Sequence, residues 1–104
     1  MTAEEVAALI GSEVGADRER TNAHGCTLER CLVTPSPAHF KCGPDASETV
    51  VPWLVLEEDF DQRNGYKVVY GEDKGMFGLA MRVADGTDWF VAWYGSFLET
   101  YDAM

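Results

Sequence analysis

The sequence predicts an α+β domain made of an N-terminal helix, an antiparallel meander sheet of about four to six strands, and a short C-terminal helix packed on the sheet. Two observations predict this class. Residues 66–94 contain three segments in which side chains alternate as in strands, and glycine-containing tight turns separate them. Residues near both ends of the chain show the spacing of a helix capping box.

Length and composition favour a single domain spanning residues 1–104. The chain has 104 residues, of which 46% are hydrophobic, which suits one core and is too short for two domains. Its formal charge of −10 opposes binding to the phosphate backbone of nucleic acid. No apolar run approaches the roughly 20 residues that cross a bilayer, and the first residues are acidic. We therefore expect no membrane partner, no nucleic-acid partner and a cytoplasmic location, where the three cysteines, an odd number, would be free thiols.

The two predicted helices begin at hydroxyl residues that are followed three places later by glutamate. Thr2 and Glu5 have this spacing at the first helix, and Gly11 is expected to end that helix by adopting a left-handed conformation. Ser96 and Glu99 have the same spacing at the last helix, which is only about two turns long. Because so short a helix is unstable alone, we expect it to dock on the sheet.

Prolines interrupt the first predicted strands. Residues 27–33 are rich in leucine and β-branched side chains and predict a strand near a sheet edge, which Pro35 and Pro37 would end. Residues 50–56 predict a second strand. Pro52 lies inside it, so this strand must either turn that position outward or contain a bulge.

The second half of the chain predicts a meander of three strands over residues 66–70, 76–83 and 89–94. Strict alternation places Trp89, Val91 and Trp93 on one face of the last strand, and it places Phe90, Ala92 and Tyr94 on the other. We expect the two tryptophans to fill the core beneath the helices.

The opposite face is the candidate recognition surface. Small residues of the neighbouring strand leave room there for a shallow concavity beside Phe90, Tyr94 and Arg82. Glu57, Glu58, Asp59 and Asp61 would form an acidic rim that favours a basic partner. Calcium binding at these carboxylates is disfavoured, because the spacing of an EF-hand loop is missing.

All the histidines and cysteines of the chain lie within one short segment, and these are the candidate metal ligands His24, Cys26, Cys31, His39 and Cys42. Four of them suffice for a tetrahedral zinc site. The spacing matches no zinc ribbon or finger, however, so free buried thiols and solvated histidines are the favoured interpretation, with no cofactor.

Three classes of function remain open. The first is a non-catalytic interaction module of the accessory, inhibitor or immunity type, which binds a protein partner through its aromatic sheet face. Self-association into a homodimer is compatible with this class. A variant of this class mimics nucleic acid with carboxylates that include Glu72 and Asp73. The second class is a small zinc or thiol protein that uses the histidine and cysteine segment, and the third is a small-molecule binder in the sheet concavity. No motif of an enzyme is present, so we expect no catalytic activity.

Overall fold

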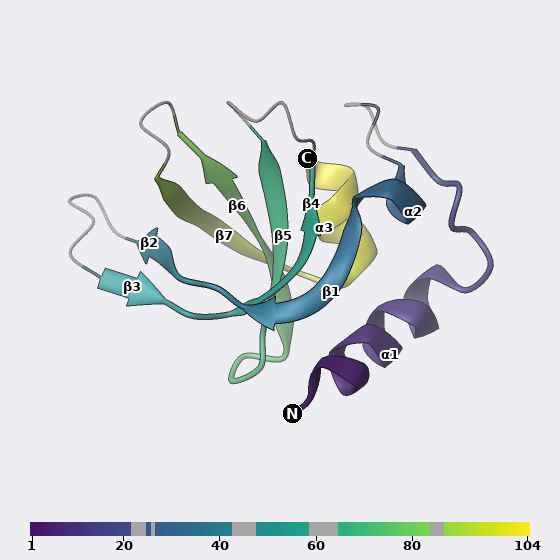
Figure 1. Ribbon diagram of the computed structural model, residues 1–104, viewed down its shortest axis with the longest axis horizontal. Coiled ribbons are helices and arrows are strands. Elements are labelled where there is room, and N and C mark those ends of the chain that lie inside the picture. The colour runs from purple at the N-terminus through teal and green to yellow at the C-terminus, as the bar shows by residue number, and fades with distance from the viewer. Residues whose placement is uncertain (22–24, 26, 43–47, 59–64, 84–86) are drawn as a thin grey trace.

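The computed structural model of the protein describes residues 1–21, 25, 27–42, 48–58, 65–83 and 87–104 (Figure 1). Its helices are α1 (Ala3–Val14), α2 (Leu28–Cys31) and α3 (Phe97–Ala103). Its strands are β1 (Leu32–Pro37), β2 (Phe40–Cys42), β3 (Glu48–Val50), β4 (Trp53–Glu57), β5 (Tyr66–Gly71), β6 (Met76–Arg82) and β7 (Asp88–Gly95). The α+β class with a helix near each end of the chain is confirmed, while the strands are somewhat more numerous than expected.

The seven strands form one sheet in the order β1-β4-β5-β6-β7-β2-β3, and this sheet curls back on itself. Strands β1 and β2 follow each other directly along the chain, as do β3 and β4, so all four belong to one long bent hairpin. At the bend, the backbone N–H of Ala38 donates to the carbonyl oxygen of Pro52 at 3.0 Å. Strands β1 and β4 form the base of the hairpin, at one end of the sheet. Strands β2 and β3 lie toward its tip, at the other end, where β2 contacts β7. The β2–β7 contact is parallel, whereas the other neighbouring strands are antiparallel.

Helix α1 begins as predicted but is longer. Both hydrogen bonds of the capping box between Thr2 and Glu5 are present. Gly11 lies inside the helix, and the positive φ of 59° falls on Gly15, which follows the last helical residue. The buried side chains of the helix continue to Val14, so the apolar face and not the first glycine decides where the helix ends.

The strand expected over residues 27–33 is wrong for most of its length. Leu28 and Cys31 are both buried and lie three positions apart, which places them on one face of the short helix α2. Strand β1 begins only at Leu32 and includes Pro35 and Pro37, which were expected to end the strand. These prolines are tolerated because β1 pairs only with β4, so their missing N–H groups belong to an edge strand.

Helix α3 has the predicted capping box between Ser96 and Glu99 and docks on the sheet as expected. The Glu13 carboxylate of α1 also accepts hydrogen bonds from the backbone N–H groups of Phe97 at 3.0 Å and Leu98 at 3.1 Å. A charged side chain of the first helix thus satisfies free donors at the start of the last helix.

The segment that follows α1 is also tied to α3. The Tyr101 hydroxyl donates to the carbonyl oxygen of Arg20 at 2.8 Å. The Arg20 guanidinium donates to the Asp102 carboxylate at 2.6 Å, and this hydrogen bond is the main reason that the pKa of Arg20 is raised above its ordinary value. None of the described helices is long and apolar enough to span a bilayer.

The sheet carries two apolar clusters on opposite faces. The larger one lies beneath α1 and α3 and contains the aromatic residues Tyr70, Phe77, Phe97 and Tyr101. The smaller one lies inside the curl of the sheet, where Phe40, Val69 and Ala80 are buried and Phe90 and Trp93 pack against them. Trp93 is therefore not part of the core beneath the helices, contrary to the sequence prediction.

Two irregularities in β7 explain this difference. In the register with β6, Ala80 lies opposite Phe90 and Leu79 opposite Ala92, so Val91 is an extra residue. A second irregularity follows Trp93, where Tyr94 is extra. Each extra residue reverses the alternation, and Phe90 and Trp93, three positions apart, come to lie on the same face. The strict division of faces expected for residues 89–94 is wrong.

Candidate functional site

The described residues form a hollow at the curl of the sheet that is lined by aromatic side chains, which we call the aromatic groove. Its volume is about 630 Å³, within the usual range for ligand sites. Phe90 and Trp93 of β7 and Trp53 of β4 lie at its wall, beside Gly71 of β5. The other lining residues come from the end of β2, the hairpin bend and the turn after β5, and they are Cys42, Val50, Val51, Pro52, Glu72, Asp73 and Lys74.

Two glycines make room for the rings of the groove. The Phe90 and Trp93 ring centroids are 4.6 Å apart, with 49° between the ring planes. A Cβ atom at Gly78 would lie 2.9 Å from a ring carbon of each, and a Cβ at Gly71 would lie 2.7 Å from Cζ3 of Trp93. Because carbon atoms pack at about 3.5–4.0 Å, neither position can hold a side chain unless the rings move. The room predicted beside Gly78 is therefore already filled by these rings, and the hollow is lined by Gly71 and not by Gly78.

The turn after β5 supplies the charges at the rim of the groove. The indole N–H of Trp53 donates to Glu72 Oε1 at 3.2 Å, and the Met1 ammonium lies 3.6 Å from the same oxygen. The Lys74 ammonium is 6.0 Å from the centre of a Trp93 ring, at the limit of a cation–π contact. Asp73 and Lys74 form no ion pair with any residue in the described part of the chain. The rim thus combines two carboxylates, one of them paired with the Met1 ammonium, with the weakly held cation of Lys74.

The three side chains predicted for the recognition surface do not come together. Phe90 lines the groove, whereas Tyr94 is 41% exposed and Arg82 is engaged elsewhere, and neither is among the groove residues. The Arg82 guanidinium lies 3.2 Å from Asp88 Oδ1, and the ammonium of Lys67 lies 3.2 Å from Oδ2 of the same carboxylate. Arg82 therefore belongs to an ion network between neighbouring strands.

The predicted acidic rim is only partly described by the structure. Glu57 belongs to the same ion network, with Oε1 at 3.5 Å from the ammonium of the buried Lys67. Glu58 accepts a hydrogen bond from the backbone N–H of Tyr66 at 3.1 Å. Asp59 and Asp61 lie outside the described residues. Neither Glu57 nor Glu58 lines the aromatic groove, where Glu72 and Asp73 provide the carboxylates.

The candidate metal ligands are distributed over several environments. Cys31 is buried in the cluster beneath the helices, Cys42 lines the aromatic groove, and His39 is exposed at the bend of the hairpin. His24 and Cys26 lie outside the described residues. Within the part of the chain that the structure describes, no three histidine, cysteine or acidic residues are close enough to hold a metal ion.

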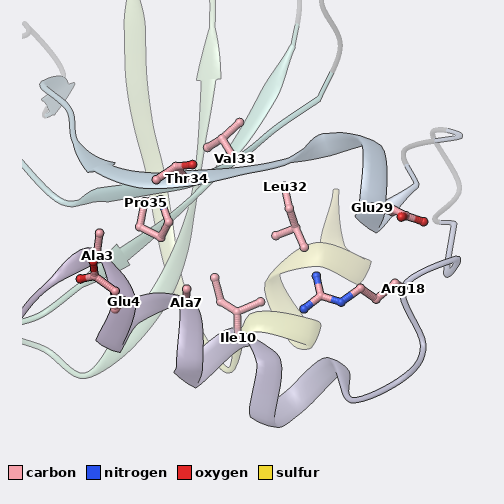
Figure 2. Close-up of a pocket in the computed structure, with 10 residues that line it drawn as sticks. All are labelled: Ala3, Glu4, Ala7, Ile10, Arg18, Glu29, Leu32, Val33, Thr34 and Pro35. Carbon is pink, nitrogen blue, oxygen red and sulfur yellow. The ribbon is translucent and has the colours of Figure 1, made fainter.

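A second hollow of about 430 Å³ lies between α1 and the edge strand β1 (Figure 2). Ala3 and Ala7 of α1 face Leu32 and Pro35 across it, and the figure shows the Arg18 guanidinium directed toward it. The residues that line it in the described part of the chain include no aromatic side chain. We regard it as the seam between a helix and the sheet edge, and the aromatic groove as the candidate functional site.

The comparisons with known proteins give no relative. No protein-family model matches the chain, and no curated protein or solved structure is significantly similar to it. The residues of the groove are therefore the basis for a functional proposal.

Sequence reasoning identified several of these residues without placing them together. Trp53, Phe90 and Trp93 belong to the aromatic segments of the sequence, and Glu72 and Asp73 were considered as mimics of nucleic acid. Lys74 was missed, and Pro52 was expected to turn outward or to form a bulge within one strand, whereas the strand is interrupted between Val50 and Trp53. The available signal was the pair of glycines around the turn at 72–74, which we interpreted only as a tight hairpin.

Proposed function

We propose that this protein is a non-catalytic interaction module that binds a basic protein partner through the aromatic groove. The observation that carries the proposal is the Phe90–Trp93 ring pair, which lies half-buried at the wall of an open hollow. Aromatic rings in this position are the residues that dominate binding energy at protein interfaces. An accessory, inhibitor or immunity protein would have a surface of this kind.

Charge supports a basic partner. Glu72 and Asp73 lie at the rim, and the whole chain has a formal charge of −10. A negative field of this size speeds encounter with a positively charged surface and disfavours acidic competitors. Cys31 and Cys42 are free thiols, which supports the proposal that the module acts in the reducing cytoplasm.

The experiment compares partner capture by immobilised wild-type protein and by variants of the groove, with the captured proteins quantified by mass spectrometry. We expect Trp93→Leu to weaken the complex about 30-fold or more, the effect of losing an interface hot spot. The double variant Glu72→Gln/Asp73→Asn should also weaken it. The matched control Glu4→Gln/Glu29→Gln removes the same charge at the second hollow and should retain the partner.

Salt provides an independent arm of the test. Because surface charges are screened over about 10 Å at 0.1 M salt and over less at higher concentrations, raising salt should reduce capture by the wild type. It should have less effect on the rim double variant. A partner that all variants retain equally, or whose capture does not depend on salt, would contradict the proposal.

A second candidate function uses the same hollow for a small molecule. The volume of about 630 Å³ and the three aromatic rings fit this use. Native mass spectrometry of the freshly purified protein tests it, since a bound compound would add a discrete mass that Trp93→Leu removes. A spectrum with only the protein mass would favour the interaction module.

A further inference from the structure

We infer that the groove binds a guanidinium group, the side chain of an arginine on the partner, stacked on the indole ring of Trp93. This inference rests on the proposed function and names the chemical group that the groove recognises. It starts from a cation that is already present. The Lys74 ammonium lies 6.0 Å from the centre of a Trp93 ring, so this ring face is one that a positive charge reaches within the protein itself.

The contact with Lys74 is weak and easily replaced. Lys74 is exposed and lies in the turn between β5 and β6, where Gly71 and Gly75 flank it closely. No carboxylate in the described part of the chain forms an ion pair with its ammonium group. A long, exposed lysine loses rotamer entropy when it is held over a ring, and the distance is at the outer limit of the interaction. A better-placed cation from a partner would therefore displace it.

The lining of the groove matches the chemistry of cation recognition. Two of its three rings are the indoles of Trp53 and Trp93, and indole is the aromatic group that attracts cations most strongly. The indole of Trp53 packs against the cluster beneath the helices, and its N–H donates to Glu72 Oε1 at 3.2 Å, an oxygen that also lies 3.6 Å from the Met1 ammonium. Asp73 adds a second carboxylate at the rim. The groove thus places the Trp93 ring, as a stacking face, and the Asp73 carboxylate, as a hydrogen-bond acceptor, in one lining.

A guanidinium uses both features at once. It is planar, stacks on aromatic rings, and donates hydrogen bonds in its own plane to carboxylates, whereas an ammonium group acts as a compact and strongly hydrated point charge. An anionic ligand would meet the Asp73 carboxylate, which forms no ion pair within the described residues, and the net charge of the chain. Arginine is thus the anchor that the groove fits best.

The test uses two short peptides and the three tryptophans as reporters. Acetyl-Gly-Gly-Arg-Gly-Gly-amide is titrated into the protein, and the indole N–H signals are followed by NMR, with citrulline in place of arginine as the uncharged control of the same shape. We expect saturable shifts of the Trp53 and Trp93 signals with the arginine peptide only. Trp89, which does not line the groove, should remain unchanged.

Two charge variants separate the ring contact from general electrostatics. Lys74→Gln frees the Trp93 ring and should tighten arginine-peptide binding about two- to fivefold, the size of a surface cation–π contact plus one removed repulsion. Arg30→Gln removes the same charge from an exposed position on α2 and should change binding by less than about twofold, because of salt screening.

Each failure has a distinct meaning. The arginine inference would be overturned by any of four results. Two concern the peptides, namely equal binding of the citrulline peptide or no saturable shift with either peptide. The other two are shifts at Trp89 alone and equal effects of the two charge variants. If Trp93→Leu still abolished partner capture in that case, the proposed function would stand with a different anchor. If partner capture were unaffected by Trp93→Leu while the arginine peptide bound as expected, the groove would be a cation site and the proposed function would fail.

Discussion

Replacing Gly71 by alanine tests whether the Trp93 ring rests on the sheet as the structure shows. The added Cβ would lie 2.7 Å from Cζ3 of Trp93, nearly 1 Å closer than carbon atoms normally pack, and it would lie closer still to Cη2 of the same ring. Overpacking of this kind destabilises by about 1–3 kcal/mol. Alanine is favoured over glycine inside a strand by about 0.5–1 kcal/mol, which offsets part of this loss. We expect a net destabilisation of about 1–2 kcal/mol.

Urea unfolding followed by tryptophan fluorescence measures this change. Gly11→Ala is the matched control, since nothing lies within 4 Å of the new Cβ and the position is inside α1. That variant should be more stable than the wild type by about 0.8–1 kcal/mol, the helix preference of alanine over glycine. The same chemical change should thus have opposite signs at the two sites. Gly71→Ala with wild-type stability and unchanged fluorescence emission would refute the placement of the ring.

Three further substitutions test the contacts that hold the helices and the sheet. Glu13→Ala removes the carboxylate that caps α3 and should lower stability by about 0.5–2 kcal/mol, seen as a lower Tm, and no change would contradict the cap. Tyr101→Phe removes the hydroxyl donor to the Arg20 carbonyl and should cost about 0.5–1.5 kcal/mol in urea unfolding, and an equal or higher midpoint would argue against that bond. Lys67→Met keeps the buried volume but leaves Asp88 with one cationic partner. We expect the free energy of unfolding to fall by about 1–3 kcal/mol, and this loss should be smaller at high salt. A gain in stability would show that the ion network is not stabilising.

The elements with strong local signals were predictable from the sequence. Both capping boxes, at Thr2 and at Ser96, formed because the side-chain spacing alone brings donor and acceptor together. The β5–β6 hairpin formed where glycine and alternating side chains agree. In such places a few neighbouring residues determine the structure, and distant contacts only reinforce it.

The parts that failed depend on distant contacts. Residues 28–31 form a helical turn because Leu28 and Cys31 both reach the core beneath the helices, and local preference for a strand does not decide the outcome. The face on which Trp93 lies depends on an extra residue at Val91 in the pairing with β6, and no sequence motif marks it. The aromatic groove needs that irregularity together with the hairpin bend at Pro52, so its residues could be named from the sequence but not brought together.

The parallel contact between Lys41 and Trp89 joins strands that are about fifty positions apart in the chain, and this separation has a kinetic consequence. Loop closure over such a distance is entropically costly, so we expect the local hairpin of β5 and β6 to form early and the ring of strands to close last. The hairpin tip would then dock on β7 late in refolding, and Phe90 and Trp93 would be more exposed to solvent before that step than in the folded protein.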